Sequence, residues 1–189
     1  METKKEIRKR ILNIRSNMTK EDVIYKSSVI MNKLTALEEY KNGKTVFVYM
    51  SFGNEVVTSE LIKRMLKENK RVIIPYTDTK NTVLIPSEIT NMEEDLVLNS
   101  FGYYEPLFEK IKAVEPEEFD LIVTPGVVFD KQLNRVGYGK GYYDRILIRK
   151  RKDTKAVAVA YDFQVLDHVP SEEHDVKMDM IITDENIYQ

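Results

Sequence analysis

The stretch most able to do chemistry is Arg-Val-Gly-Tyr-Gly-Lys-Gly-Tyr-Tyr-Asp-Arg at residues 135–145. Its three glycines alternate with larger residues: Gly137, Gly139 and Gly141. Such a backbone can adopt conformations closed to other residues and bring its N–H groups close to an anion. The start of the helix expected next would add a partial positive charge, and Arg135 and Lys140 add full charges. This combination suits the phosphates of a nucleotide.

The spacing of these glycines fits neither common phosphate-binding motif. A Walker A loop needs Ser or Thr after Gly-Lys, whereas Gly139-Lys140 is followed by another glycine. The dinucleotide fingerprint is Gly-x-Gly-x-x-Gly, whereas this loop is Gly-x-Gly-x-Gly. A flexible surface loop with incidental charge is therefore an alternative. Tyr142, Tyr143 and Asp144 disfavour it, because a bland loop needs neither two aromatic rings nor a carboxylate.

The three residues after the glycines each admit two interpretations. Asp144, just inside a helix, is a routine partner of the helix dipole. Beside a phosphate loop it could equally hold Mg²⁺, which takes only one or two protein carboxylates when it is bound to phosphates. Tyr142 and Tyr143 could pack between helix and sheet, or one of them could line a flat heteroaromatic ligand.

An alternation of helices and strands must position this loop. Apolar periodicity predicts helices over 2–16, 19–39, from Thr58, and over 142–150, and strands at 45–50, 71–75, 82–85, 120–125, 155–160 and 178–183. This rhythm predicts an α/β fold: a mainly parallel sheet with crossover helices in Rossmann-like layers, and an N-terminal helical hairpin packed on it. Residues 86–119 are expected to be irregular with a short helix, and 126–141 to be a long connection. The whole chain, 1–189, is expected to be one domain.

Composition narrows the class of protein. The 189 residues include no cysteine, which excludes disulfide scaffolds, thiolate metal sites and cysteine catalysis. The formal net charge is −2, which argues against a strong polyanion binder, but residues 131–152 hold eight basic side chains and one acid, and residues 1–20 hold seven and two. No run reaches the length of a membrane span and the N-terminus lacks the apolar core of a signal peptide, so we expect a cytoplasmic protein.

The segment VTPGVVFDKQLNRVGYGKGYYDR, at 123–145, resembles the signature of the 5-formyltetrahydrofolate cyclo-ligase family. Four other features support the resemblance in the family's order: the basic N-terminal helix, Glu-x-x-Thr within 51–58, FGYYEP at 101–106, and His174-Asp175-x-x-x-Asp179. Departures are mild. Val136 stands where leucine is commoner, the position of Tyr138 varies within the family, and 86–119 matches only through FGYYEP.

The resemblance implies an ATP- and Mg²⁺-dependent ligase. It would convert 5-formyltetrahydrofolate to 5,10-methenyltetrahydrofolate, ADP and phosphate. The γ-phosphoryl group of ATP passes to the formyl oxygen, and N10 attacks the resulting iminium phosphate. Such chemistry requires positioning and charge neutralisation rather than a protein nucleophile, which agrees with a site of glycines, basic residues and carboxylates.

The resemblance also implies roles for individual residues. ATP contacts are implied for Lys4, Arg8, Arg135, Val136, Gly137, Tyr138, Gly139, Lys140, Gly141, Tyr142 and Tyr143. Folate contacts are implied for Met50, Glu55, Tyr138, Gly139, Lys140, Gly141 and Tyr142, and more weakly for Tyr104, Glu105 and Pro106. Arg135 and Lys140 would act in catalysis by stabilising charge on the transferring phosphoryl group, and Asp144 and Asp175 would hold Mg²⁺.

Several of these residues have ordinary alternatives. Lys4 and Arg8, one helical turn apart, could form a solvated basic face. Glu55 could be a solvated loop acid, Asp175 could bond to its own loop backbone, and His174 is expected to be a structural hydrogen-bonding residue rather than a catalyst.

Two other functions are alternatives to the ligase. A sugar-phosphate isomerase or coenzyme A transferase would need neither a magnesium pair nor the Gly-x-Gly-x-Gly-Tyr-Tyr-Asp run. An RNA-binding module could use the aromatic and basic residues around Lys140, but it has little use for Glu55, Asp144 and Asp175. We therefore expect small-molecule partners, 5-formyltetrahydrofolate and ATP, no nucleic acid, no membrane contact and a monomer.

Overall fold

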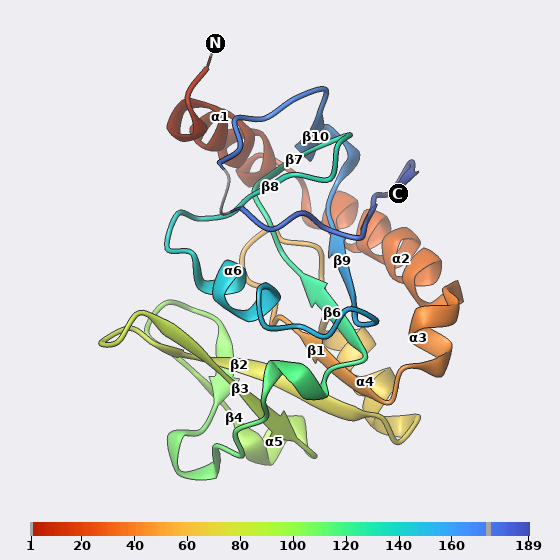
Figure 1. Ribbon diagram of the computed structural model, residues 1–189, viewed down its shortest axis with the longest axis vertical. Coiled ribbons are helices and arrows are strands. Elements are labelled where there is room, and N and C mark those ends of the chain that lie inside the picture. The colour runs from red at the N-terminus through yellow and green to blue at the C-terminus, as the bar shows by residue number, and fades with distance from the viewer. Residues whose placement is uncertain (1, 173–174) are drawn as a thin grey trace.

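A seven-stranded, mostly parallel sheet forms the centre of the molecule in the computed structural model, which describes residues 2–172 and 175–189 (Figure 1). Its strands, in spatial order, are β12 (Ile187–Tyr188), β11 (Met180–Ile182), β9 (Lys155–Val159), β6 (Leu121–Thr124), β1 (Thr45–Val48), β2 (Arg71–Asp78) and β3 (Val83–Ile89). The five inner strands pair in parallel, and the outermost strand on each side is antiparallel to its neighbour. The predicted α/β class and mainly parallel sheet are confirmed.

Two smaller sheets and a set of helices surround it. A three-stranded sheet has the order β10 (Val165–Leu166), β7 (Val128–Asp130), β8 (Arg135–Val136), and a hairpin joins β4 (Leu96–Leu98) to β5 (Tyr104–Pro106). The α-helices are α1 (Lys4–Ser16), α2 (Lys20–Ala36), α3 (Glu38–Asn42), α4 (Ser59–Lys67), α5 (Met92–Asp95) and α6 (Tyr142–Leu147). Three 3₁₀ turns are η1 (Phe108–Lys110), η2 (Pro116–Glu118) and η3 (Asp162–Gln164).

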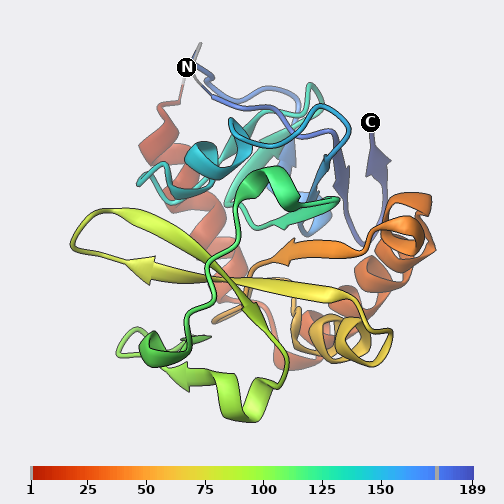
Figure 2. The same ribbon diagram turned by 60° about the horizontal axis from the view of Figure 1, so that its bottom comes forward.

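The continuous apolar runs predicted as buried strands are buried because helices cover both faces of the sheet. In β1, Val46 and Val48 contact the cluster that includes α2 and α4, whereas Phe47 contacts the opposite cluster with α6. All three are fully buried. Figure 2 shows α4 and α6 on opposite sides of the sheet. Parallel strands covered in this way are uniformly apolar rather than alternating.

The two N-terminal helices pack on different sheets, and the first begins at Lys4 rather than at the predicted residue 2. The Thr19 hydroxyl accepts a hydrogen bond from the Asp22 amide at 3.1 Å and opens α2 as expected. Helix α2 packs on the main sheet, but α1 packs its buried Ile7 and Ile11 against the three-stranded sheet. The predicted second helix also divides at Leu37, whose extended backbone ends α2 before α3 begins.

Some expected connections contain strands. Residues 126–141 carry the β7–β8 hairpin, and 86–119 carry β4, β5 and the end of β3. Strand β3 pairs antiparallel with β2 because a four-residue turn joins them, which is too short for a parallel crossover. The last strand, β12, was not predicted because two residues show no periodicity.

The predicted end of the last helix is wrong, and the helix expected from Thr58 begins without a side-chain cap. Helix α6 ends at Leu147 rather than near residue 150. Thr58 stands at the start of α4 but does not cap it with its side chain, because its hydroxyl donates to the Tyr49 carbonyl at 2.8 Å.

The strand order determines where a ligand can bind. Among the parallel strands the chain runs β1 then β2 in one direction, and then β6, β9 and β11 in the other. The order therefore reverses between β1 and β6. In open α/β sheets the crevice outside the carboxyl ends of strands at such a switch point is the usual ligand site.

Candidate functional site

A cavity of about 720 Å³ opens at this switch point. Its lining includes residues after β1 and after β6, together with α1, the β4–β5 hairpin and the loop between β8 and α6. Apart from the weaker folate candidates Glu105 and Pro106, every residue assigned to a site from the sequence lines it: Lys4, Arg8, Met50, Glu55, Arg135, Val136, Gly137, Tyr138, Gly139, Lys140, Gly141, Tyr142, Tyr143, Asp144 and Asp175. Residues as far apart in the sequence as Lys4 and Asp175 therefore share one cavity, although their individual roles stay predictions.

Two of the three glycines in the loop have backbone conformations that favour glycine, and the N-terminal helix contacts the loop. Gly139 and Gly141 have φ values of +97° and +66°, in the region that favours glycine, and Gly141 precedes α6. The Arg8 guanidinium donates from Nε to the Gly137 carbonyl at 2.8 Å. A Cβ on Gly139 would come 3.5 Å from Arg8 Nη2, so α1 and the loop lie in contact. The loop is thus supported from the N-terminal helix.

Arg135 is a buried cation at the base of this loop. Its side chain is only 4% exposed, and Nη2 donates to Asp144 Oδ1 at 2.8 Å. The guanidinium carbon lies 5.7 Å from the centre of the Tyr143 ring. Within the described residues Nε is buried without a hydrogen-bond partner.

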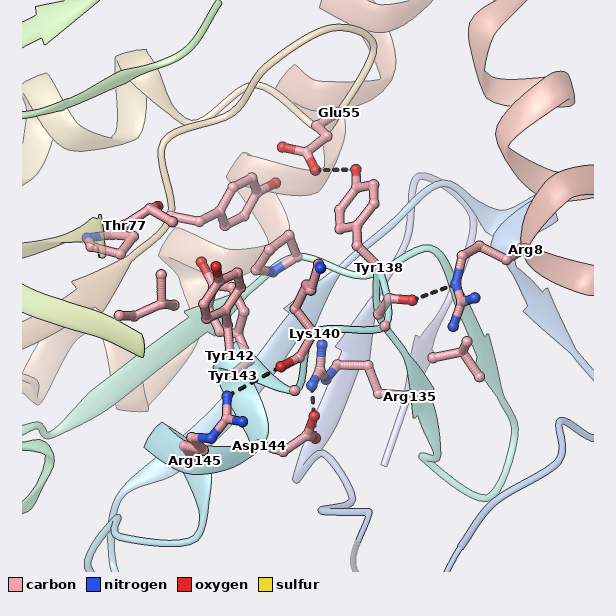
Figure 3. A pocket seen from close by; sticks show the side chains of 18 of the residues that line it. Arg8, Glu55, Thr77, Arg135, Tyr138, Lys140, Tyr142, Tyr143, Asp144 and Arg145 are labelled. Atoms are coloured by element: carbon pink, nitrogen blue, oxygen red, sulfur yellow. Dashed lines mark hydrogen bonds and ion pairs between the residues drawn. The ribbon is translucent and has the colours of Figure 1, made fainter. Parts of the chain in front are cut away.

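Lys140 differs from Arg135 in being exposed at the cavity mouth. Figure 3 shows its side chain extending from the loop into the cavity. Its carbonyl accepts a hydrogen bond from Arg145 Nη1 at 3.1 Å, which holds the loop backbone beside α6. The backbone of Lys140 is therefore held in place while its side chain is exposed.

Glu55 is a buried carboxylate across the cavity from the glycine loop. It is 3% exposed, so it is not the solvated loop acid of the alternative interpretation. Tyr138 donates its hydroxyl to Oε1 at 2.6 Å, and the Phe52 amide donates to Oε2 at 3.2 Å (Figure 3). Burial raises the pKa of Glu55, while the Tyr138 hydrogen bond and the charge of Arg15 oppose that rise.

Asp175 lies beside α1 rather than in an isolated loop. Its Oδ2 accepts from Lys4 Nζ at 2.7 Å and from the Glu172 amide at 2.8 Å. The bond to its own loop is thus present together with the ion pair to Lys4. Although burial lowers the pKa of Lys4, the hydrogen bonds to Asp175 and Glu172 raise it overall. The role expected of His174 lies outside the described residues.

The carboxylates suit a magnesium ion that is held mainly by a nucleotide. Within residues 2–172 and 175–189 no group of three or more acidic or histidine side chains could hold a metal alone. Mg²⁺ bound to phosphates needs only one or two protein carboxylates. Asp144 and Asp175 both line the cavity, and each pairs with a cation there. The donor set therefore fits Mg²⁺ accompanied by phosphates and does not fit an all-protein site.

Comparisons with known proteins agree with this geometry. The model of the 5-formyltetrahydrofolate cyclo-ligase family matches residues 1–184. The chain belongs to this family. The 5-formyltetrahydrofolate cyclo-ligase of Haemophilus influenzae is 32% identical over 93% of this chain and 94% of its own length. The mouse 5-formyltetrahydrofolate cyclo-ligase is 30% identical over 89% and 87%.

Solved structures give the same result for the fold. The 5,10-methenyltetrahydrofolate synthetase of Aquifex aeolicus superimposes with a TM-score of 0.86 at 33% identity, over 98% of this chain and 92% of that one. That of Mycoplasma pneumoniae gives 0.78 at 28% identity, over 96% and 98%. The predicted resemblance is confirmed, and this cyclo-ligase family member is an enzyme.

The cyclo-ligase cavity also contains residues that sequence reasoning did not assign. Phe52 and Tyr103 stand in its wall with ring centres 5.5 Å apart, and Phe52 lies 5.9 Å from Tyr138. FGYYEP could have indicated Tyr103, because aromatic residues gather in it. Arg15 is not among the lining residues but bonds to the Tyr138 hydroxyl; it was missed because helical spacing alone does not show which basic residue is buried.

The three residues that the resemblance implied more weakly as folate contacts differ in their positions relative to the cavity. Tyr104 lines the cavity. The carboxylate of Glu105 accepts a hydrogen bond from the Thr77 amide at 3.2 Å, which ties β5 to β2. Pro106 is buried away from the lining residues.

Proposed function

We propose that this family member is an ATP- and Mg²⁺-dependent ligase acting on 5-formyltetrahydrofolate. The observation that carries the proposal is that a glycine-rich cationic loop and a buried carboxylate line the same cavity. Phosphates would bind on the loop side, and the pterin would bind on the Glu55 side. The formyl oxygen would then lie between them.

The reaction balances without a protein nucleophile. The formyl oxygen attacks the γ-phosphorus of ATP, and ADP leaves. The iminium phosphate that results is electrophilic at the formyl carbon, so N10 attacks it, forms the new carbon–nitrogen bond and loses its proton. Departure of phosphate then gives 5,10-methenyltetrahydrofolate. Each step gains from fixed geometry and from positive charge near the phosphoryl group.

Charge neutralisation falls to four basic residues of the cavity: Lys4, Arg8, Arg135 and Lys140. Arg135 is the fixed member, because burial and the Asp144 pair hold its guanidinium with Nε unpaired in the described part of the chain. Lys140 is the mobile member and follows the transferring group. A preorganised donor aimed at developing charge contributes about 10²–10³ in rate.

The pterin would be recognised by Glu55. A buried carboxylate is suited to the paired amino and ring N–H donors of a pterin, because charged hydrogen bonds away from water are strong. Met50 and Tyr142 would form apolar walls of this half of the cavity. The backbone around Gly139 and Gly141 would lie at the junction with the nucleotide.

Asp144 and Asp175 would hold Mg²⁺ with the phosphates. The ion would supply positive charge that offsets charge developing on the transferring group. We also propose that the chain acts in the cytoplasm as a monomer and as one domain. No helix within residues 2–172 and 175–189 has the length and apolar character needed to cross a bilayer.

The proposal is tested by mixing the protein with 5-formyltetrahydrofolate and Mg-ATP and following the absorbance of 5,10-methenyltetrahydrofolate. Product should form only when both ATP and Mg²⁺ are present, with one ADP released per product. Absence of product across pH and magnesium concentration, from protein whose circular dichroism is that of a folded α/β chain, would contradict it.

A further inference from the structure

Arg15 and Tyr138 connect the two halves of the cavity through hydrogen bonds. Arg15, on the last turn of α1, donates from Nη2 to the Tyr138 hydroxyl at 2.6 Å. That hydroxyl in turn donates to Glu55 Oε1 at 2.6 Å. The hydroxyl therefore accepts from a cation and donates to an anion, which is the arrangement that strengthens both bonds.

The two charged residues of these contacts are buried, whereas Tyr138 between them is 42% exposed. Arg15 is 7% exposed and Glu55 is 3% exposed. The guanidinium carbon of Arg15 also lies 5.8 Å from the centre of the Tyr138 ring, so the ring and the hydroxyl both contact the same cation. Away from water, the loss of either bond would leave a charged group poorly compensated.

Tyr138 belongs to the glycine loop, so its position depends on the loop's backbone. It stands between Gly137, whose carbonyl accepts from Arg8, and Gly139, which packs on the Arg8 guanidinium. Phosphates that order the loop would therefore also fix the Tyr138 side chain. A carboxylate held by Tyr138 would conversely restrain the loop.

We propose that Arg15 is a positioning residue that acts through Tyr138 to orient Glu55, and that Tyr138 thereby couples nucleotide binding to folate binding. The inference rests on the proposed function, because it takes the loop as the phosphate site and Glu55 as the pterin ligand. It adds that each substrate raises the affinity for the other by the same factor, since coupling between two ligands is reciprocal.

The coupling is measured with 5-formyltetrahydrofolate and a non-hydrolysable ATP analogue with Mg²⁺. In the wild type, saturating analogue should tighten folate binding by about fivefold or more, within the usual range of coupling between sites. The coupling ratio is the Kd for folate without the analogue divided by the Kd with it. Tyr138→Phe keeps the ring beside Phe52 but removes the hydroxyl, so this ratio should fall towards one. Folate KM should rise by about tenfold, the effect of losing a hydrogen bond to a charged group.

Arg15→Lys supplies a second variant because it keeps the charge but loses the guanidinium geometry. It should reduce the ratio less than Tyr138→Phe does. Two control variants make the same substitutions at exposed residues outside the cavity. Tyr25→Phe removes the hydroxyl of a tyrosine that is 71% exposed, and Arg10→Lys changes an exposed arginine paired with Glu2. Both controls should leave the ratio unchanged.

A pH profile separates positioning from general structural support. The charge that acts on Glu55 is that of Arg15, and the hydroxyl that bonds to it is that of Tyr138. Burial and the charge of Glu55 together raise the pKa of four tyrosines from several elements: Tyr49, Tyr138, Tyr143 and Tyr161. Burial raises the pKa of Glu55, and Tyr138 and Arg15 oppose that rise. Without the hydroxyl the pKa rises further, so the acid limb of kcat/KM for folate should move to higher pH. A merely structural defect would lower the whole profile without moving that limb.

The coupling inference fails if the wild-type ratio is one, or if Tyr138→Phe keeps the wild-type ratio and acid limb. Either result would leave the ligase proposal intact as long as the wild type forms 5,10-methenyltetrahydrofolate. Absence of that product from the wild type would instead contradict the ligase proposal itself.

Discussion

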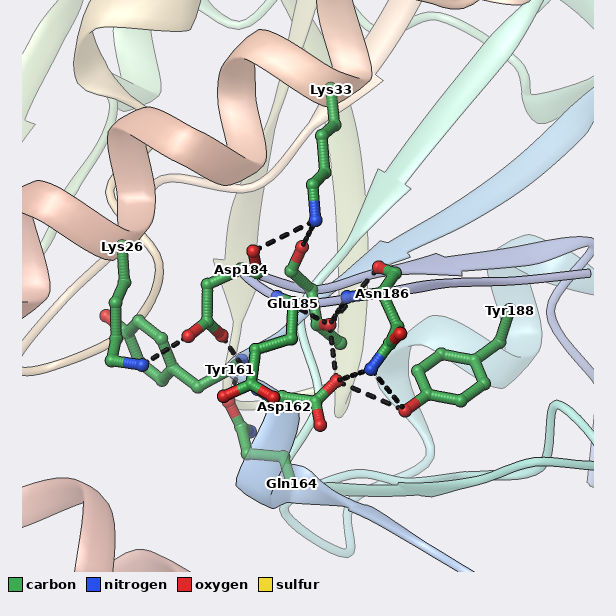
Figure 4. A network of polar contacts seen from close by, with 10 residues as sticks. Lys26, Lys33, Tyr161, Asp162, Gln164, Asp184, Glu185, Asn186 and Tyr188 are labelled. Carbon is green, nitrogen blue, oxygen red and sulfur yellow. Dashed lines mark hydrogen bonds and ion pairs between the residues drawn. The ribbon is translucent and has the colours of Figure 1, made fainter.

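Two clusters of polar side chains lie at the same edge of the main sheet and differ in the hydrogen bonds that their carboxylates accept. The cavity follows β1 and β6. The second cluster, the C-terminal network, follows β9 and β11 and is formed around Asp162 and Asp184 (Figure 4). Asp162 Oδ1 accepts from the side chains of Thr183, Asn186 and Tyr188 at 2.6–3.1 Å. Asp184 accepts from Lys26 and from the Asp162 amide.

The difference is visible in the direction of two pKa shifts. Burial raises the pKa of Glu55, and among the described residues two groups donate to it directly, the Tyr138 hydroxyl and the Phe52 amide. For Asp162 burial also acts to raise the pKa, but hydrogen bonds from Thr183, Asn186 and Tyr188 lower it overall. The network thus satisfies its carboxylate internally, whereas the cavity leaves hydrogen-bonding capacity for a ligand. We therefore expect one cluster at this edge of the sheet to stabilise the fold and the other to bind ligands.

The largest effect on the cavity side is expected from Lys140→Ala. Because Lys140 is exposed, its removal should leave no buried group unsatisfied. Turnover should fall by about 10²–10³, while the free energy of unfolding changes by less than about 0.5 kcal/mol. Absorbance assays and urea unfolding measure the two quantities. Lys152→Ala, at another exposed lysine, is the control. Equal loss of stability and turnover would make Lys140 part of a structural loop instead.

Asp144→Asn tests the magnesium assignment. The variant should need at least about tenfold more Mg²⁺ for half-maximal turnover, because an amide is a weaker ligand than a carboxylate. Raising the Mg²⁺ concentration should restore part of the activity. Asp153→Asn changes an exposed carboxylate paired with Arg151 and should leave the magnesium dependence unchanged. An unaltered magnesium requirement in Asp144→Asn would assign Asp144 to holding Arg135 alone.

Glu55→Gln should separate binding from stability. Folate KM should rise by about tenfold, because the charge that meets the pterin donors is lost. A carboxyl whose folded pKa is raised contributes stability below its unfolded pKa and loses that contribution as the pH rises through the folded value. The variant should therefore gain stability relative to the wild type as the pH rises towards 7 and match it in acid.

Unfolding by urea at several pH values measures that difference. Glu109→Gln, at an exposed glutamate, should show no such pH dependence. A Glu55→Gln variant that loses stability at neutral pH would show that the buried carboxylate supports the fold, and the contrast between the two clusters would fail.

Asp162→Asn should give the opposite pattern in the C-terminal network. Loss of a well-bonded carboxylate should cost about 1–3 kcal/mol at neutral pH. Since the pKa of Asp162 is lowered, its contribution is present above the unfolded pKa and lost as the pH falls through the folded value. The stability difference should therefore shrink in acid, while kcat stays unchanged because Asp162 is not among the cavity-lining residues.

Urea unfolding across pH again measures the effect. Asp167→Asn, which alters an exposed carboxylate paired with Lys131, is the matched control. A large fall in kcat without a loss of stability in Asp162→Asn would show that the network belongs to the site after all.

The structure also changes the interpretation of the basic run at 131–152. Only part of its charge reaches the cavity, through Arg135, Lys140 and Arg145. Arg149 pairs with Glu115 and Glu117, and Arg151 pairs with Asp120 and Asp153. Glu115, Glu117 and Asp120 come from a distant segment, so counting charges along the chain could not separate a phosphate site from a paired surface. This pairing also removes much of the reason to propose an RNA groove.

Local patterns were sufficient for much of the fold and the site. The apolar run of β1, the capping by Thr19 and the glycines that open α6 depend on neighbours in the chain, so their residue types alone predict them. The same holds for the 135–145 motif, which indicated a phosphate loop and the family. Strands β7, β8 and β12 were missed because two or three residues show no periodicity and gain stability only from a partner strand.

By itself, the sequence determined the cationic glycine loop, since this follows from short-range spacing, and the resemblance of its motifs to a known family implied the residues of the cavity. Tertiary structure alone decided which charged side chains are buried and which groups they contact. Arg15 reads as one of many basic residues on a helix, and Glu55 reads as a loop acid. Only the packing of α1 beside the loop after β1 brings both of them to the Tyr138 hydroxyl. Burial and long-range hydrogen bonds depend on distance in space, which spacing along a chain does not encode.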